Sequence, residues 1–298
     1  MKKLLIIILT VIFIAGCSNS KAPAEKATTQ QTAPQAQAQD TQKRPELKVH
    51  FLDVGQGDSI LVQFPGGQNM LVDAGKNDSA NTITNYLKKA GVSKIDFLVG
   101  THPHEDHIGS MDTVIKSFQI GEVYMPRATT TTKTFRDVLA AIKDKGLKII
   151  TAKAGVNIMK ADNLTADIIA PHKGEYESLN NHSAVIKITY DHVSFLLTGD
   201  AEEQSEFEML ASSVVSPKAD VLKVGHHGSK SSTSAGFLKA VSPKYAVISV
   251  GANNDYNHPH KGTIDKLKKA GVEVLRTDEK GTILFVTNGK DISYSISK

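Results

Sequence analysis

Short hydrophobic runs dominate the chain after its first 46 residues, and glycine- or proline-containing turns separate them. The first three runs, at residues 48–54, 59–64 and 69–73, have the length and composition of strands joined in an antiparallel meander. Hydrophobic positions then recur every three or four residues over 83–90, which predicts a helix that ends at Gly91. The pattern therefore begins with strands and continues into strand–helix alternation.

This alternation continues to the end of the chain. Further strands are predicted at residues 95–99, 121–125, 185–189, 193–197, 220–224, 244–250, 282–286 and 292–296. Further helices are predicted after His107 and near residues 135–145, 202–210, 234–240 and 263–270. The chain thus has two halves, each of which begins with strands and continues with alternating strands and helices. Two such halves fit an α/β fold, a single-domain four-layer αββα sandwich over residues 47–298. Two sheets would face each other in it, and helices would cover the outside.

The first 46 residues have a different character. A basic start at Lys2 and Lys3 precedes a hydrophobic run over residues 4–15, which is too short to span a bilayer as a stable helix. This layout predicts a secretory signal peptide over residues 1–16. The following stretch, up to about residue 46, is rich in Ala, Gln, Thr, Lys and Pro, which is typical of a disordered linker.

Cys17 is the only cysteine in the sequence, which excludes an intrachain disulfide and a cysteine nucleophile. It directly follows Ile14-Ala15-Gly16, and the four residues resemble the lipobox of bacterial lipoproteins, in which the cysteine is lipidated and becomes the mature N-terminus. An ordinary signal peptide with an incidental cysteine is the alternative. Lipidation would anchor the secreted protein, through the linker at residues 17–46, to the outer face of the bacterial cell membrane.

One segment has the sequence Thr-His-Pro-His-Glu-Asp-His and ends at His107. It follows the predicted strand 95–99, and residues two apart on extended chain point the same way, so His102 and His104 can face one metal ion. Asp106 and His107 lie at the start of the predicted helix, turned toward a second position. Imidazole and carboxylate suit zinc, manganese or iron, and an open coordination position allows hydrolysis. A solvated histidine-rich loop is the alternative.

Other ligand-type residues follow predicted strands, where open sheets tend to place ligand sites. Asp200 lies on a glycine turn, the pair His226 and His227 stands between glycines, and His258 and His260 flank a proline. Glycines beside a histidine pair suit close approach of backbone and side chains to a metal ion or a phosphate. Taken alone, a Gly-Asp turn at a strand end is a weak signal.

The formal net charge of +4 is unevenly distributed. Residues 47–216 carry more Asp and Glu than Lys and Arg, whereas residues 217–298 carry more Lys and Arg. Lys223, Lys230 and Lys261 lie beside the histidine motifs and could grip phosphates, with solvated helix surfaces as the alternative. The total is far from the strongly basic footprint of a duplex DNA-binding protein.

These motifs together resemble the metallo-β-lactamase superfamily of binuclear metal hydrolases. The histidine-rich segment, Leu71-Val72-Asp73-Ala74-Gly75 and Gly199-Asp200 carry that resemblance. More closely, the chain resembles the soluble hydrolase domain of ComEC-type competence DNA-uptake proteins over residues 47–287. The motifs that carry this closer resemblance lie at residues 52–59, 197–200, 226–229 and 257–260. With no hydrophobic span beyond the signal, the chain looks like a free-standing, lipid-tethered relative.

The resemblance implies the roles of individual residues. The implied metal ligands are His102, His104, Asp106, His107, Asp200 and His227. Asp200 would bridge two divalent ions, Zn²⁺ or Mn²⁺. Either His226 or His227 would complete the second ion, and we expect His227 as the ligand and His226 as a phosphate contact.

One part of the superfamily pattern is missing. The residues before the strand 185–189 lack the usual third histidine, and the nearby His182 is either its replacement or a turn residue. The first ion could therefore be weakly held or completed by water. Asp73 is expected to support the ligands, whereas Asp53 and Asp58 either shape their own loop or contact the metal-ligand loop.

The resemblance implies hydrolysis of phosphodiester bonds in DNA or RNA by a hydroxide shared between the two ions. Asp106 belongs to this catalytic centre, His226 would donate to the phosphoryl oxygen, and His258 or His260 would protonate the leaving alkoxide. One alternative is a phosphodiesterase or esterase of cell-wall or small-molecule substrates, such as phosphocholine esters. Another is a non-catalytic lipoprotein that binds metal or DNA.

Overall fold

The computed structural model describes residues 10–16, 18 and 44–298. The chain divides into two units, residues 1–42 and 43–298. In the first unit, the described residues lie outside helices and strands and are exposed. The predicted lipidation site Cys17 and most of the predicted signal and linker fall outside the described residues. Within the described ranges, no helix is long and apolar enough to cross a membrane.

The second unit contains two mixed sheets. The larger sheet has eight strands in the order β15-β14-β1-β2-β3-β4-β5-β6. Its pairs from β15 to β3 are antiparallel, and its pairs from β3 to β6 are parallel. The strands are β1 (Leu47–Phe51), β2 (Ile60–Gln63), β3 (Asn69–Val72), β4 (Lys94–Val99), β5 (Gln119–Met125), β6 (Ile149–Thr151), β14 (Ile283–Thr287) and β15 (Ile292–Ile296).

The smaller sheet repeats this plan with seven strands in the order β13-β12-β11-β10-β9-β8-β7. Its pairs from β7 to β10 are antiparallel, and its pairs from β10 to β13 are parallel. The strands are β7 (Val156–Ala161), β8 (Leu164–Ala170), β9 (Val185–Tyr190), β10 (Val193–Leu197), β11 (Val221–Lys223), β12 (Tyr245–Ile248) and β13 (Glu273–Arg276).

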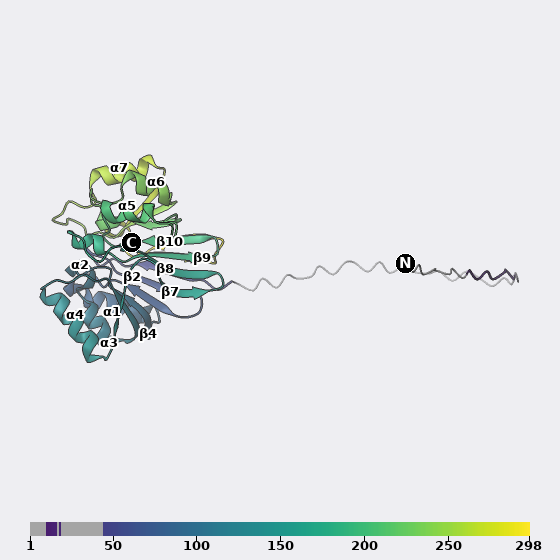
Figure 1. The fold of residues 1–298 in the computed structure, drawn as a ribbon, viewed down its shortest axis with the longest axis horizontal. Coiled ribbons are helices and arrows are strands. Elements are labelled where there is room, and N and C mark those ends of the chain that lie inside the picture. Colours follow the sequence, from purple (N-terminus) through teal and green to yellow (C-terminus); the bar gives the residue numbers. More distant parts are fainter. Residues whose placement is uncertain (1–9, 17, 19–43) are drawn as a thin grey trace, which may run out of the picture. The chain divides into compact units, whose positions relative to one another are not determined.

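Helices cover the outer face of each sheet (Figure 1). Helices α1 (Ala80–Lys89), α3 (Met111–Ser117) and α4 (Lys133–Asp144) pack on the larger sheet. Helices α5 (Glu203–Ala211), α6 (Ala235–Val241) and α7 (Lys261–Lys269) pack on the smaller one. Shorter helical segments are α2 (Glu105–Ile108), α8 (Thr277–Lys280), η1 (Asn77–Ser79), η2 (Leu179–His182) and η3 (Gly225–Gly228). The predicted four-layer α/β sandwich is confirmed.

Alternating side chains of the strands build this layering. In β2, Ile60 and Val62 enter the core between the sheets, whereas Leu61 enters the core under the helices. In β3, Met70 and Leu71 divide in the same way. Because successive side chains of a strand point to opposite faces, a strand that is hydrophobic throughout must be covered on both sides. The continuous hydrophobic runs of the sequence therefore fit strands enclosed between a second sheet and a layer of helices.

The parallel strands of both sheets end at the same edge of the sandwich. The histidine-rich segment follows β4 of the larger sheet. Asp200, the pair His226 and His227, and the segment with His258 follow β10, β11 and β12 of the smaller sheet. The two sheets thus deliver the predicted ligands from opposite sides, at the end where α/β sheets bind ligands.

Two features of the structure differ from the predicted elements. Strands β6, β7, β8 and β13 were not predicted, and the helical stretch predicted around and after His107 is divided into α2 and α3. The register between β7 and β8 shifts between Asn157 and Met159, and that between β8 and β9 shifts between Ile168 and Ala170. Such irregularities interrupt the two-residue alternation by which a strand is recognised in sequence.

Candidate metal centre

The histidine-rich segment leaves β4 as extended chain and turns into α2. His104 has extended backbone angles immediately before the helix, and His102 is completely buried. Their side chains point the same way, since His102 Nε2 lies 3.0 Å from His104 Nδ1. His102, His107 and Asp200 each offer an atom within 4.8 Å of the others. Because His104 adjoins His102 and both histidines are implied ligands, we take His102, His104 and Asp200 as the first group of candidate ligands.

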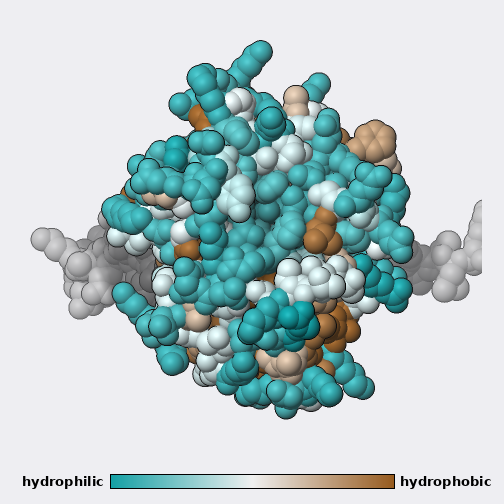
Figure 2. Space-filling view, turned by 90° about the vertical axis from the view of Figure 1, so that its left-hand side faces the viewer, coloured by the Kyte–Doolittle hydropathy of each residue, from teal (hydrophilic) through white to brown (hydrophobic). Residues whose placement is uncertain are grey.

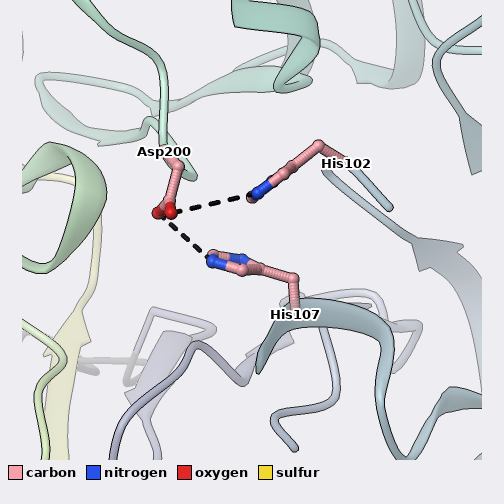
Figure 3. Close-up of side chains that lie close together, drawn as sticks. All are labelled: His102, His107 and Asp200. Atoms are coloured by element: carbon pink, nitrogen blue, oxygen red, sulfur yellow. Dashed lines mark ion pairs between the residues drawn. The ribbon is translucent and has the colours of Figure 1, made fainter. Parts of the chain in front are cut away.

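Asp200 lies at the centre of the candidate ligands. Its carboxylate is buried, and its oxygens lie 3.2 Å from His107 Nε2 and 3.9 Å from His102 Nε2. Figure 3 shows both imidazoles pointing at this carboxylate from the larger sheet, while Asp200 comes from the smaller one. The turn before it requires glycine at position 199, where φ is +52°. A Cβ added there would lie only 3.0 Å from the side chain of Thr101.

The second group of candidate ligands consists of Asp106, His107 and His227, each offering an atom within 4.8 Å of the others. His227 Nε2 lies 3.2 Å from an Asp106 oxygen and 3.6 Å from an Asp200 oxygen. The carboxylate of Asp200 therefore faces both groups, which is the position that a bridging ligand would need.

Two buried partners orient the histidines of the second group. His107 Nδ1 lies 2.7 Å from an oxygen of the buried Asp73, and Thr101 donates to both oxygens of that carboxylate. His227 Nδ1 lies 2.9 Å from the carbonyl oxygen of Ser249. Each contact leaves Nε2 directed at the carboxylates, as in metal-binding histidines whose other nitrogen is hydrogen-bonded. Asp73 thus contacts a candidate ligand from behind.

His226 lies at the wall of the cavity and not inside either group. Its Nε2 is 3.7 Å from an Asp200 oxygen, and its Nδ1 is 3.3 Å from Glu202 Oε1 and 3.2 Å from Ser231 Oγ. Both His226 and His227 have left-handed backbone angles, with φ of +48° and +51°. This backbone turns the two rings to different surroundings, one partly exposed and one buried.

The structure separates the two C-terminal histidines. His258 lines the cavity, and its ring centroid lies 5.4 Å from that of His226. Burial, together with His226 and His227 nearby, lowers the pKa of His258 to about 4. His260 precedes α7, does not line the cavity, and accepts a hydrogen bond from the backbone of Lys230 at 3.0 Å.

His182 does not take the place of the missing third ligand. His182 lies in η2, where its Nε2 accepts a hydrogen bond from the backbone of Tyr176 at 3.2 Å and its ring packs edge-on against the Tyr176 ring. Its neighbour Ser183 instead contacts the first group, with its hydroxyl 3.3 Å from His102 Nδ1 and accepting from the backbone of Asp200. These contacts favour the interpretation of His182 as a turn residue.

Lys223 is a residue whose position the sequence did not reveal. Its side chain is completely buried, forms an ion pair with Asp58 at 2.9 Å, and cannot grip a phosphate as expected. Asp58 lies behind the second group, 3.5 Å from His227 Nδ1 and 4.0 Å from His107 Nδ1. Because β11 is covered by a sheet and by helices, its last residue is enclosed although it is charged. Lys230 and Lys261 are exposed.

The loop that carries Asp58 rests on the histidine-rich segment. Asp58 N donates to the carbonyl oxygen of Asp106 at 3.1 Å. A Cβ at Gly57 would lie 2.3 Å from the same oxygen, so only glycine permits this approach. Asp53 has a different place, because its carboxylate accepts from Gly55 N and pairs with Lys298. Of the two aspartates, Asp58 contacts the metal-ligand loop and Asp53 shapes its own loop.

The residues fit divalent metal ions. Within the described part of the chain, three buried atoms of the cluster lack a hydrogen-bond partner: His107 Nε2, Asp200 Oδ1 and Asp58 Oδ1. Buried polar atoms are normally satisfied, so orphaned donor and acceptor atoms that face one another indicate a missing partner. Imidazole nitrogens combined with carboxylates are a ligand set that zinc, manganese and iron accept.

Protons on histidine balance the buried carboxylates in the metal-free chain. Burial lowers the pKa of His107, but Asp200, Asp73 and Asp106 together raise it well above its usual value. Burial raises the pKa of Asp200, but His107 and His227 hold it well below its usual range. In His102, burial and the nearby His107 lower the pKa. A divalent ion would replace the bound protons as the compensating charge.

An open cavity of about 410 Å³ lies over the two groups. Its lining residues come from both sheets: Gln56, Lys76, Pro103, His104, Glu105, Asp106, Thr130, Thr132, Asp200, His226, His227, Tyr256 and His258. Both groups of candidate ligands thus face a space large enough for a small substrate or part of a polymer. The adjoining side of the molecule, near α2, is mainly hydrophilic, with hydrophobic residues in small separate patches (Figure 2).

Comparison with known proteins identifies relatives along most of the chain. The sequence profile of the Metallo-beta-lactamase superfamily matches residues 52–252. ComE operon protein 3 of Bacillus subtilis (strain 168) is 33% identical over 270 residues, which cover 84% of this chain and 34% of that protein. Competence protein ComA of Neisseria gonorrhoeae is 30% identical over 241 residues, which cover 80% of this chain and 32% of that protein. The chain spans about a third of the length of these curated relatives.

The solved structures agree in fold. The metallo-β-lactamase fold protein YhfI from Bacillus subtilis superposes with a TM-score of 0.54 at 15% identity, over 82% of this chain and 100% of that chain. At this identity the likeness concerns the fold alone. The resemblance to competence proteins, inferred from the motifs, is confirmed by the two relatives.

Proposed function

The chain belongs to the metallo-β-lactamase superfamily, whose fold and metal-dependent hydrolase class it shares, and we propose that it hydrolyses phosphodiester bonds in nucleic acid. The observation that carries this proposal is the position of Asp200, which lies 3.9 Å from His102, 3.2 Å from His107 and 3.6 Å from His227, under an open cavity that His226 and Lys76 also line. Cationic and hydrogen-bonding groups beside a two-ion centre suit an anionic phosphodiester.

In this proposal each ion is held by both sheets. His102, His104 and Asp200 would hold the first ion, and Asp106, His107, His227 and Asp200 would hold the second. Two divalent ions, Zn²⁺ or Mn²⁺, supply an activated water and positive charge for the developing anion when they are bound. Asp73 and the Ser249 carbonyl keep the histidines of the second group oriented for that role.

The remaining cavity residues act on the substrate. In its doubly protonated form, His226 would donate from Nδ1 to Glu202 behind it and from Nε2 to a phosphoryl oxygen. Hydrogen bonding to His226 holds the pKa of Glu202 down at about 2, so Glu202 is a carboxylate when it orients this ring. His258 lines the cavity and would protonate the leaving alkoxide once the anionic substrate is present, which makes it a better candidate than His260.

Nucleic acid is proposed as the substrate because the relatives include a protein named for competence. The same relatives and the hydrophobic run before Cys17 support an extracytoplasmic protein. We propose a signal peptide at residues 1–16, lipidation of Cys17, a linker up to residue 46 and a hydrolase domain at 47–298. A Cys17→Ser variant that stays with the membrane after fractionation would contradict the lipid anchor.

The chain, stripped of metal and reloaded with Zn²⁺ or Mn²⁺, should cleave single-stranded DNA, double-stranded DNA or RNA. The same preparation is tested on bis-p-nitrophenyl phosphate, beside Asp106→Ala and His104→Ala variants. Metal-dependent cleavage of a polymer that both variants lose supports the proposal. Cleavage of the small diester alone would redirect the search to cell-wall or choline phosphodiesters, and metal binding without turnover would indicate a binding protein.

A further inference from the structure

We infer that Tyr256 is a stacking surface for an unpaired nucleobase next to the scissile phosphodiester. This inference rests on the proposed function and specifies its substrate as a nucleic-acid strand whose bases are free to leave a duplex stack. The phosphate would lie over the ligand groups, and the neighbouring base would lie on the tyrosine ring. Tyr256 would determine specificity and would take no part in bond cleavage.

The position of the ring supports this role. Tyr256 lines the cavity together with His226 and His258, yet the residue is 60% exposed to solvent. Its ring stacks on that of His258 with centroids 5.7 Å apart and planes 23° apart. Nothing in the described part of the chain hydrogen-bonds to its hydroxyl. One face of a large ring is therefore supported from the cavity side, while much of the side chain remains in contact with water.

The loop that carries the ring is fixed by hydrogen bonds. Asn254 Oδ1 accepts from the backbone of Tyr256 at 3.2 Å and from that of His258 at 3.0 Å. Its amide nitrogen donates to the carbonyl oxygens of Gly251 and His258. Gly251 N in turn donates to Gln56 Oε1 at 3.2 Å. The exposure of Tyr256 thus belongs to an anchored loop, and a preformed stacking surface loses little entropy on binding.

The surroundings favour a nucleobase over a quaternary ammonium group such as choline. Recognition of such cations uses cages of several aromatic rings. Among the described residues, Tyr256 is the single Phe, Tyr or Trp that lines this cavity. A single ring does not form such a cage, whereas it suffices to stack a base.

Stacking on Tyr256 requires a base whose face is free. Within a duplex each base is stacked between its neighbours, so its faces become available only after unpairing or at a strand end. The ring is sequence-tolerant, because every base has a π-face. We therefore expect binding of single strands to exceed binding of duplexes and to vary little with sequence.

The test measures binding without cleavage. Each variant is made in the full chain carrying Asp106→Ala, and fluorescence anisotropy follows binding of a single-stranded oligodeoxynucleotide and of its abasic counterpart. Tyr256→Ala should weaken binding of the base-bearing strand by about tenfold, the scale of one base–aromatic stack. It should leave binding of the abasic strand unchanged, and Tyr256→Phe should bind as the parent does. Tyr294→Ala, on β15, is the matched control.

Equal loss on both strands would overturn the inference and leave Tyr256 as a support for His258. The inference would also be overturned if Tyr256→Ala bound the base-bearing strand as tightly as the parent does. Failure of the proposed function looks different, because the parent itself would then bind neither strand, and this inference would fall with it. Tyr256→Leu, which keeps apolar contact with His258 but lacks a planar ring, should behave as Tyr256→Ala does.

Discussion

The two ligand groups are built with different support. In the second group, His107 is backed by the Asp73 carboxylate and His227 by a backbone carbonyl. In the first group, His102 Nδ1 faces the hydroxyls of Thr101 and Ser183, at 3.1 and 3.3 Å. A carboxylate behind an imidazole raises its basicity, whereas a hydroxyl does so much less.

The first group also has fewer ligands. It shares Asp200 and adds two histidines, and His182, the histidine close to the expected third position, is engaged with Tyr176. We therefore expect two unequal ion positions, with the second group holding its ion more tightly. Both ion positions would thus be present in this fold, but only the second would have a full set of ligands with hydrogen-bond partners behind its histidines.

The largest effect is expected where the two groups meet. Asp200→Ala removes the carboxylate that faces both groups, so metal-dependent phosphodiester cleavage should fall by about 1000-fold. Steady-state rates and metal content by mass spectrometry measure this loss. Asp53→Ala removes a carboxylate outside the cavity and should keep both. If Asp200→Ala lost one ion and kept the other at full affinity, the groups would not share this residue.

A large effect on folding is expected behind the second group. Lys223→Met leaves Asp58 buried without its cation and should lower the free energy of unfolding by about 3–5 kcal/mol. The double variant Asp58→Asn and Lys223→Met should recover most of that loss, because no charge remains unpaired. Urea unfolding of the metal-free protein measures both values. Lys133→Met removes the exposed partner of Asp137 and should cost less than about 1 kcal/mol.

Residues that hydrogen-bond to the ligand histidines should contribute more to ion affinity in the second group than in the first. Asp73→Asn should weaken binding of the tighter ion by about 10–100-fold. Ser183→Ala, behind His102, should weaken binding of the weaker ion by only a few-fold, since a hydroxyl polarises the ring less. Calorimetric titration of metal into the stripped protein resolves the two sites. Equal losses in both variants would remove the basis of the comparison.

The two groups should also respond differently to pH. The raised pKa of His107 keeps this imidazole protonated at neutral pH without metal, so an ion at its Nε2 must displace the proton. Affinity of the second group should therefore fall as pH decreases, by about tenfold per pH unit for one proton. The lowered pKa values of His102 and His104 leave the first group deprotonated and insensitive until lower pH. Titrations in buffers of different ionisation enthalpy count the released protons.

Much of the site could be predicted because its residues lie next to each other in sequence or directly after strands. The spacing of His102 and His104 on extended chain put their nitrogens on one side, as the structure has them. The layering followed from hydrophobic runs such as β2 and β3. Strands β7 and β8 could not be predicted in this way, since bulges break their alternation.

The supporting residues could not be predicted, because their roles depend on contacts between distant segments. Lys223 looks like one of many lysines until Asp58, from a loop far away in sequence, is placed beside it. Glu202 looks like part of a helix start and turns out to hold His226. Whether a charged residue is buried depends on which layers cover its strand, and a local pattern does not contain that information.

The ligands of each ion come from two sheets, and this gives the ions a mechanical role. The histidine-rich segment extends from the larger sheet, whereas Asp200 and His227 extend from the smaller one. Each ion would thus link the two sheets to each other at the end of the sandwich where the cavity opens. Removal of the ions by a chelator should then loosen this end first. Amide hydrogen exchange would become faster in the loops after β4, β10 and β11, while the amides at the opposite edge would stay protected from exchange.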